Sequence, residues 1–211
     1  MFLTGNVLLM LGLLVFAYLM GSIPTALIIG KSAKKIDIRE HGSGNLGATN
    51  AVRVLGIRLG LAIFFSDMFK AFLPALIARL LTGNINFALI VGLVAVLGHC
   101  YPIFAGFKGG KGIASGVGMF FAISPLAAAL GLITFGLSLL LGKMVSLASM
   151  LGALSVPIVT TIAYPNEYGV ILLSWVLFIF VIFKHIPNIK KIIKGTERKV
   201  IFWKKKKGKN E

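Results

Sequence analysis

Long apolar runs alternate with short polar segments along this chain. Most of these runs are close to or above the roughly 20 residues that a helix needs to cross a bilayer. We expect them to be helices at residues 6–30, 59–81, 87–104, 113–141, 145–164 and 168–183. The first run is too long for a signal-peptide core and has no basic start, so we interpret it as a span. The pattern predicts an all-α integral membrane protein with one polytopic domain over residues 1–211.

We expect two of the prolines in the apolar runs to interrupt them. Pro24 follows Gly21-Ser22-Ile23 in the first run. A proline removes a backbone donor, so we expect a kink there and a neighbouring element that satisfies the freed carbonyl. Pro125 follows Ser124 inside the 29-residue run 113–141.

The basic residues predict the topology. They concentrate in the segments 31–58 and 106–112 and in a tail from Lys184, with a basic end at 199–211. Loops rich in Lys and Arg stay in the cytoplasm, so the chain must cross an even number of times between residues 112 and 184. Splitting the run 113–141 at Ser124-Pro125 gives four crossings. We therefore predict seven transmembrane helices, some short, broken or re-entrant, with the N-terminus outside and the C-terminus cytoplasmic. A six-span alternative would put one polar loop on the wrong side.

Composition excludes several classes of protein. The chain is 57% hydrophobic, and its formal charge of +16 lies in loops and tail, so the charge indicates topology rather than nucleic-acid binding. Cys100 is the single cysteine and is expected to be a small buried apolar residue. The six carboxylates are scattered, so we expect neither a metal nor a cofactor. Asp67 and Lys70 are the exception, because their spacing suits an ion pair on one helix face, more structural than catalytic.

The first candidate site is the segment 39–53, which reads R-E-H-G-S-G-N-L-G-A-T-N-A-V-R. Its glycines allow backbone angles that are closed to other residues, and arginine suits phosphate. Either Thr49 or Asn50 is expected to cap a following helix whose free N–H groups favour an anion. The alternative is a surface turn rich in turn formers. The short polar side chains of this segment are Ser43, Asn45, Thr49 and Asn50, flanked by Arg39 and Arg53.

The second candidate site combines lysine with glycine at residues 106–112. Lysines supply point charges for phosphate, and glycines leave backbone N–H groups free to bind an anion. The spacing does not match a Walker A loop. Taken alone, the segment is equally well a generic basic turn, and it gains weight from sharing the predicted cytoplasmic face with the first. Its residues include Lys108, Gly109, Gly110, Lys111 and Gly112.

Two further polar points lie on the same predicted face. Ser146 and Ser149 follow Lys143, and serines in membrane helices often only bond to their own backbone. His185 stands where the last span is expected to end, as a general base, a hydroxyl-orienting group or an interfacial residue. His99 serves in chemistry or in holding the second loop. Two anion sites beside apolar spans fit a reaction between a soluble phosphate compound and a lipid.

Several motifs together resemble the bacterial acyl-phosphate:glycerol-3-phosphate acyltransferase family (PlsY). The resemblance covers nearly the whole chain, and Lys184 departs from it where many members carry arginine. Its motifs are G-S-I-P at 21–24, D-I-R at 37–39, G-S-G-N-L-G-A-T-N at 42–50, G-H-C-Y-P-I-F at 98–104, F-K-G-G-K-G at 107–112, S-L-A-S at 146–149, H-I-P-N-I at 185–189 and G-T-E at 195–197.

The resemblance implies seven membrane helices with a cytoplasmic-facing site in the bacterial cell membrane. It implies acyl transfer from acyl phosphate to the sn-1 hydroxyl of glycerol 3-phosphate. The products are lysophosphatidic acid and phosphate, the first step of phospholipid biosynthesis. It implies no cofactor, and as partners membrane lipids and the soluble enzyme that forms acyl phosphate. Gly195 and Glu197 are expected to support the fold.

The site residues implied by the resemblance fall into two groups. The catalytic group comprises Ser43, Arg53, Lys111 and His185. The substrate-binding group comprises Asn45, Gly47, Thr49, Asn50, Lys108, Gly109, Gly110, Gly112, Ser146, Ser149 and Asn188.

We expect direct attack by the substrate hydroxyl, because phosphate is already a good leaving group. The proton acceptor is either His185 or the phosphate of glycerol 3-phosphate, and an acyl-enzyme on Ser43 is a third possibility. Rival classes fit less well. A transporter would show inverted repeats, an H-x-x-x-x-D acyltransferase needs an aspartate five residues after a histidine, and an alcohol phosphotransferase needs clustered aspartates.

Overall fold

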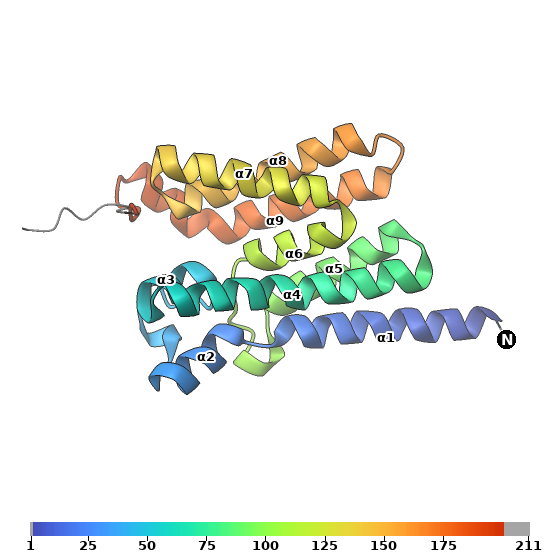
Figure 1. The fold of residues 1–211 in the computed structure, drawn as a ribbon, viewed down its shortest axis with the longest axis horizontal. Coiled ribbons are helices and arrows are strands. Elements are labelled where there is room, and N and C mark those ends of the chain that lie inside the picture. The colour runs from blue at the N-terminus through green and yellow to red at the C-terminus, as the bar shows by residue number, and fades with distance from the viewer. Residues whose placement is uncertain (1, 201–211) are drawn as a thin grey trace, which may run out of the picture.

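The computed structural model describes residues 2–200, with side-chain burial described from residue 6 onwards. Residues 2–200 form helices and loops without a strand, which confirms the all-α prediction (Figure 1). The helices are α1 (Phe2–Ser22), α2 (Thr25–Lys34), η1 (Ile38–Glu40), α3 (Ala48–Leu55), α4 (Ile57–Thr82), α5 (Ile85–Cys100), η2 (Ile103–Ala105), α6 (Ile113–Ile123), α7 (Pro125–Gly142), α8 (Val145–Ala163) and α9 (Tyr168–Ile193).

Six helical segments of the described chain are long and apolar enough to cross a membrane. They cover Asn6–Lys34, Ile57–Thr82, Ile85–Ala105, Pro125–Gly142, Val145–Ala163 and Tyr168–Ile193. The shorter apolar helix α6, Ile113–Ile123, is a seventh element. The count of seven spans and their orientation stay predictions.

Both proline breaks predicted from the sequence are present. Helix α1 ends at Ser22 and α2 begins at Thr25, so Pro24 separates two helices. The carbonyl that Pro24 leaves without its helical donor is that of Met20, and it accepts from the N–H of Ile23 at 3.3 Å, so the break is satisfied locally and not by a neighbouring element as predicted. The ammonium of Lys70 in α4 donates to the carbonyl of Ile23, next to the proline, at 2.9 Å. At the second break, the Ser124 hydroxyl accepts from the backbone N–H of Ala127 and caps α7.

The last helix is longer than the hydropathy pattern predicted. We expected the final span to end at Phe183 and a tail to begin at Lys184. Instead α9 continues through Pro187 to Ile193. Of the basic tail predicted at 199–211, the residues after Val200 lie outside the described part of the chain.

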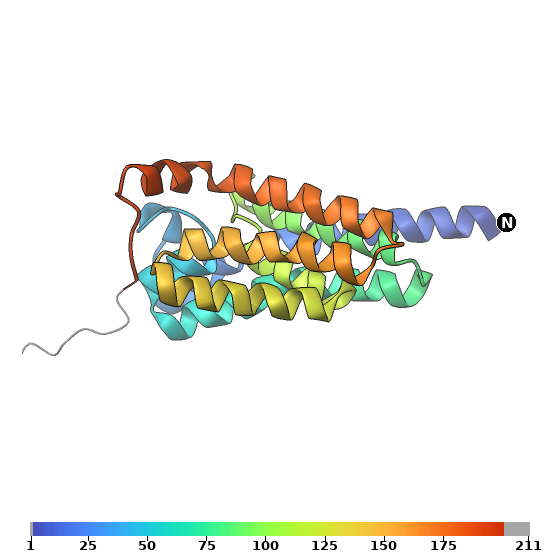
Figure 2. The same ribbon diagram turned by 90° about the horizontal axis from the view of Figure 1, so that it is seen from above.

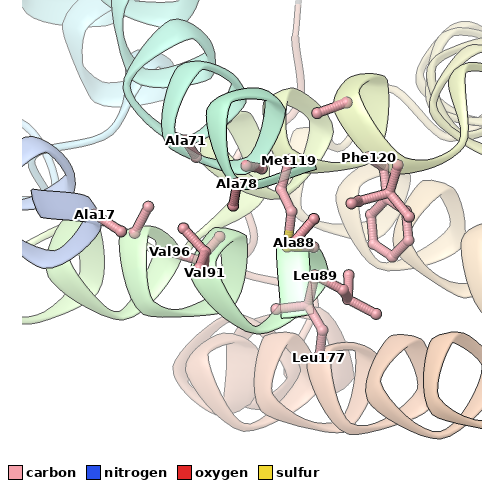
Figure 3. Close-up of a cluster of buried hydrophobic side chains, with 14 of the residues drawn as sticks. Ala17, Ala71, Ala78, Ala88, Leu89, Val91, Val96, Met119, Phe120 and Leu177 are labelled. Carbon is pink, nitrogen blue, oxygen red and sulfur yellow. The ribbon is translucent and has the colours of Figure 1, made fainter. Parts of the chain in front are cut away.

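Small residues let the helices pack closely around a buried core (Figure 3). Ala17, Ala71, Ala78 and Ala88 are fully buried there. A side chain at Gly118 would overlap the backbone of α4, so α6 lies directly against it. Such close contacts replace the hydrophobic driving force that helix association lacks in lipid. Large apolar side chains remain exposed on the outside, as expected for a surface that faces lipid.

The polar segments gather at one end of the bundle. In Figures 1 and 2, α2, α3, the α7–α8 turn and the end of α9 lie at the end opposite the N-terminus. The turns near residues 83 and 165 lie toward the N-terminal end. The loop between η2 and α6 lies inward of the polar end, where Gly109 and Pro24 line one small cavity. This arrangement agrees with the single polar face that the charge pattern predicted.

Candidate active site

The first polar loop is folded around the side chain of Asn50. The amide oxygen of Asn50 accepts from the backbone N–H of Ser43 at 2.8 Å. Its amide nitrogen donates to the carbonyls of Ile38 and His41 at 3.3 and 3.1 Å. Asn50 is buried, whereas the side chains of Ser43 and Thr49 are exposed. Asn50 therefore fixes the loop from inside, and the two hydroxyls face outward.

The prediction that Thr49 or Asn50 caps the helix is wrong. Helix α3 begins at Ala48, and Gly47 stands at the cap position without a side-chain bond. The carbonyl of Gly47 accepts from the N–H groups of Asn50 and Ala51, so both candidate caps already lie in the first turn. Asn45 shapes the entry to the helix, because its side-chain oxygen accepts from the N–H of Gly47 at 2.9 Å.

The glycines of this loop differ in their backbone requirement. Gly42 and Gly44 have φ values of 67° and 69°, in the left-handed region that favours glycine. Gly47 has a φ of −94°, which other residues also adopt, so the expected special angle is absent there. The loop therefore turns at Gly42 and Gly44 and then enters α3 with its first N–H groups directed away from the helix body.

The two arginines that flank the loop are in different environments. Arg39 pairs with Asp37 at 2.6 Å, and this guanidinium lowers the pKa of the Asp37 carboxyl to about 2. Arg53 makes no hydrogen bond or ion pair to another residue in 2–200. Partial burial and the neighbouring charge of Arg198 lower the pKa of Arg53. Arg53 is thus the arginine with its charge free for a ligand.

The second loop lies against the end of α5. The N–H of Gly110 donates to the carbonyl of His99 at 3.1 Å. A side chain at Gly109 would overlap that carbonyl, and one at Gly110 would overlap the His99 imidazole. The expectation that His99 holds this loop is confirmed. Gly112 takes a φ of 82° as the chain turns into α6.

Of the two lysines in this loop, only Lys111 is bonded to another polar segment of the described chain. Lys111 donates a hydrogen bond to the side-chain oxygen of Asn188 on α9. Burial disfavours the charged form and lowers the pKa of Lys111 to about 8. Lys108 is exposed and makes no side-chain hydrogen bond within 2–200. Lys111 therefore connects the second loop to the last helix.

Glu197 joins the remaining polar segments. Its carboxylate accepts from the Ser146 hydroxyl at 2.7 Å and from the Asn188 amide at 2.9 Å. Its charge also raises the pKa of Lys111 and that of Arg53 against the lowering caused by burial. From the sequence, Glu197 was expected only to support the fold. Its motif at 195–197 was visible, but nothing in the sequence indicated its partners.

The other predicted residues of α8 and α9 are close by. Ser149 and His185 are both buried. The Nδ1 of His185 is 2.8 Å from the carbonyl of Val181, and because a carbonyl can only accept, Nδ1 carries the hydrogen. In a neutral ring this leaves Nε2 as an acceptor. Arg198 was not predicted from the sequence, because it is one of several basic residues near the end of the chain. Its charge lowers the pKa of Arg53.

The two glycine loops also meet each other. The side-chain nitrogen of Asn45 donates to the carbonyl of Gly109 at 3.5 Å, the outer limit of a hydrogen bond. The first loop thus contacts the second, the second contacts α9 through Lys111, and α9 contacts α8 through Glu197. The cluster combines cations, hydroxyls and backbone donors, a set suited to phosphate groups.

Comparisons with known proteins agree on one family. Residues 11–195 match the family model for glycerol-3-phosphate acyltransferase. The chain is 46% identical to glycerol-3-phosphate acyltransferase of Bacillus subtilis, over 89% of this chain and 96% of that protein. It is 44% identical to glycerol-3-phosphate acyltransferase 2 of Bacillus anthracis, over 89% and 97%.

Two solved structures have the same fold. Both are crystal structures of PlsY (YgiH), an integral membrane glycerol 3-phosphate acyltransferase. The glycerol 3-phosphate form has a TM-score of 0.87 and 40% identity, covering 91% of this chain and 96% of that one. The lysophosphatidic acid form has a TM-score of 0.85 and 39% identity, covering 91% and 95%.

Proposed function

Because the chain belongs to the glycerol-3-phosphate acyltransferase family, we propose that it transfers a fatty acyl group from acyl phosphate to the sn-1 hydroxyl of glycerol 3-phosphate. The products are lysophosphatidic acid and inorganic phosphate. The site lies in the cytoplasmic half of a bacterial cell membrane, as the basic loops indicate. Membrane lipids surround it, and a soluble enzyme supplies the acyl phosphate.

The observation that carries this proposal is the contact between two phosphate-suited loops through Asn45 and Gly109. A donor with a phosphate leaving group and an acceptor with its own phosphate require two neighbouring anion sites. Acyl-CoA presents no phosphate at the reacting carbonyl, so a cluster of this kind favours acyl phosphate. The solved relative bound to glycerol 3-phosphate supports the choice of acceptor.

The proposed reaction is a direct displacement at the acyl carbon. The sn-1 oxygen forms a bond to the carbonyl carbon, and the bond between that carbon and the phosphate oxygen breaks. The hydroxyl proton goes to a base, and phosphate leaves with the electron pair. Holding both substrates at this contact supplies much of the rate, because effective concentration replaces a bimolecular encounter.

The cations stabilise the leaving group in this proposal. Arg53 and Lys111, together with the loop N–H groups, stabilise the charge that grows on the departing phosphate. The side chains of Ser43 and Thr49 are exposed on the first loop and contribute hydroxyl donors to the departing phosphate. Lys108 and the glycines 109, 110 and 112 complete the second loop. Asn50 and Gly47 serve the same substrate by keeping the first loop folded.

The acceptor contacts come from α8 and α9. Ser146, Ser149, His185 and Asn188 bind glycerol 3-phosphate, and Glu197 orients two of them. The free Nε2 of His185 is an acceptor for the hydroxyl proton. The phosphate of glycerol 3-phosphate is the alternative acceptor, and a measured His185 variant decides between them.

The test is a product assay. Purified protein in detergent receives glycerol 3-phosphate and palmitoyl phosphate, and lysophosphatidic acid and phosphate are quantified. We expect the two products in equal amounts, and no acylated protein in the mass spectrum of quenched samples. An acyl group trapped on Ser43 would overturn direct attack, and the absence of lysophosphatidic acid would overturn the proposed function.

A further inference from the structure

A buried ionic cluster of Asp67, Lys70 and His99 lies next to the two loops of the proposed site. Asp67 in α4 is 1% exposed. Its Oδ1 is 2.8 Å from the ammonium of Lys70 and 3.5 Å from Nδ1 of His99. The same oxygen accepts from the Thr25 hydroxyl at 2.6 Å. One carboxylate oxygen therefore contacts α4, α5 and the start of α2.

The expected ion pair of Asp67 and Lys70 is confirmed, but stability alone does not explain it. Charged groups within membrane spans are costly and mark functional positions by default. A buried ion pair is also weak evidence for stability, because apolar residues of similar volume often serve as well. The contacts made on the far side of the cluster indicate what else it does.

His99 connects the buried Asp67–Lys70 pair to the second loop. Its imidazole contacts Asp67 on one side and lies against Gly110 on the other, where any side chain would overlap the ring. Its carbonyl holds the N–H of Gly110 at 3.1 Å. The orientation of the ring therefore sets the position of the backbone that precedes Lys111.

The cluster also reaches the first loop. Asp67, Lys70 and His99 line a small cavity with room for about one water molecule. Leu46 of the first loop and Gly109 of the second line the same cavity. Lys70 meanwhile holds the carbonyl of Ile23 at the α1–α2 break. The ionic cluster thus lies against both loops.

We propose that Asp67 is a positioning residue for the acyl transfer, acting through His99 on the backbone at residues 109–111. Asp67 touches neither substrate. As an acceptor, it fixes the His99 ring and the Thr25 hydroxyl. This holds the two loops in a fixed relative position, so that Lys111 and Asn45 are correctly placed for the two phosphate groups. This inference rests on the proposed function, because its effect is measured on that reaction.

The test compares two double variants that both remove the buried charges. Asp67→Asn/Lys70→Met keeps a side-chain oxygen at position 67, whereas Asp67→Leu/Lys70→Met does not. Neither leaves an unpaired buried charge, so we expect similar melting temperatures. We expect the Leu variant to have a kcat lower by about tenfold or more, because small displacements at a site have large rate effects. Hydrogen exchange at residues 109–111 is expected to be faster in the Leu variant.

A matched control separates positioning from stability. Thr160→Val removes the 2.8 Å hydrogen bond between Thr160 and Ser174, which joins α8 and α9 in the buried interior. We expect it to lower the melting temperature and leave kcat within about twofold of the wild type. Equal kcat for the two double variants would overturn the inference, as would a kcat that follows melting temperature across all three.

Failure of the inference is distinguishable from failure of the proposed function. Wild-type protein that makes no lysophosphatidic acid from acyl phosphate contradicts the function, whereas hydrogen exchange needs no activity. If Asp67→Leu/Lys70→Met does not fold, His99→Leu replaces it, because that change keeps the ion pair of Asp67 and Lys70. The same loss of kcat and faster exchange are expected, and wild-type values for both would overturn the inference.

Discussion

The hydroxyl of Ser146 donates to the carboxylate of Glu197 at 2.7 Å, across 51 residues of sequence. The same oxygen of Glu197 accepts from Asn188 at 2.9 Å. These bonds join the start of α8 to the end of α9 and fix two of the side chains proposed to bind glycerol 3-phosphate. A residue outside the set of proposed ligands thus organises that set.

Replacing Glu197 with alanine is expected to weaken acceptor binding. Each hydrogen bond to a charged group contributes about 1.5–3 kcal/mol, so the loss of ordered Ser146 and Asn188 should raise the KM for glycerol 3-phosphate by roughly tenfold or more. Steady-state kinetics with each substrate varied in turn measures this. The control is Glu167→Ala, which removes a carboxylate that accepts from Asn86 in the turn region at the other end of the bundle. An equal effect of both variants would contradict the prediction.

The basic limb of the pH profile is expected to report Lys111. Burial lowers the pKa of Lys111 to about 8, so its cation is present below that pH and is lost as the pH rises through it. Since kcat/KM reports the free enzyme, it should fall above pH of about 8 if the cation is required. Lys111→Arg should move this fall to higher pH, because arginine stays protonated.

Glu197 provides an internal check on this assignment. Its carboxylate raises the pKa of Lys111, so Glu197→Ala should shift the fall in kcat/KM to lower pH. A profile that is unchanged in both the Lys111 and the Glu197 variants would assign the basic limb to another group.

The two arginines that flank the first loop are expected to behave differently. Arg53→Lys keeps the charge but loses the planar fork, and we expect kcat/KM to fall by roughly 100-fold, as for the loss of one oxyanion donor. Arg39→Lys should stay within about threefold, because Arg39 forms an exposed pair with Asp37 and such pairs contribute little. Comparable losses in the two variants would show that the distinction between them is wrong.

His185→Ala decides the identity of the proton acceptor. With Nδ1 bonded to the carbonyl of Val181, Nε2 is the nitrogen available for the hydroxyl. If His185 is the base, kcat should fall by about 100-fold or more while the KM changes little. A near-normal kcat with a raised KM would remove His185 as the base and assign the proton to the phosphate of glycerol 3-phosphate.

Hydropathy and proline positions predicted most of the fold. The breaks at Pro24 and Ser124 follow from a missing backbone donor, which is a local property that sequence carries. The end of α9 was misplaced at Phe183, because hydropathy reports where apolar residues stop and not where a helix stops. The cap of α3 was also misplaced, because the start of this helix is set by hydrogen bonds that the carbonyl of Gly47 accepts from the first turn.

Contacts between distant segments were less accessible to sequence reasoning. The spacing of Asp67 and Lys70 predicted their pairing, because both lie on one helix face. Nothing local connects Ser146 to Glu197, Lys111 to Asn188 or Asp67 to His99. These pairs form only when α4, α5, α8 and α9 are packed, and they decide which of the polar residues share one site.

The donor preference of the purified protein tests the central claim most directly. Glycerol 3-phosphate is supplied with palmitoyl phosphate in one reaction and with palmitoyl-CoA in another, with EDTA in both, and lysophosphatidic acid is measured. We predict product from palmitoyl phosphate alone. Product from palmitoyl-CoA at a similar rate, or no product from either donor with folded protein, would contradict an enzyme built around two phosphate sites.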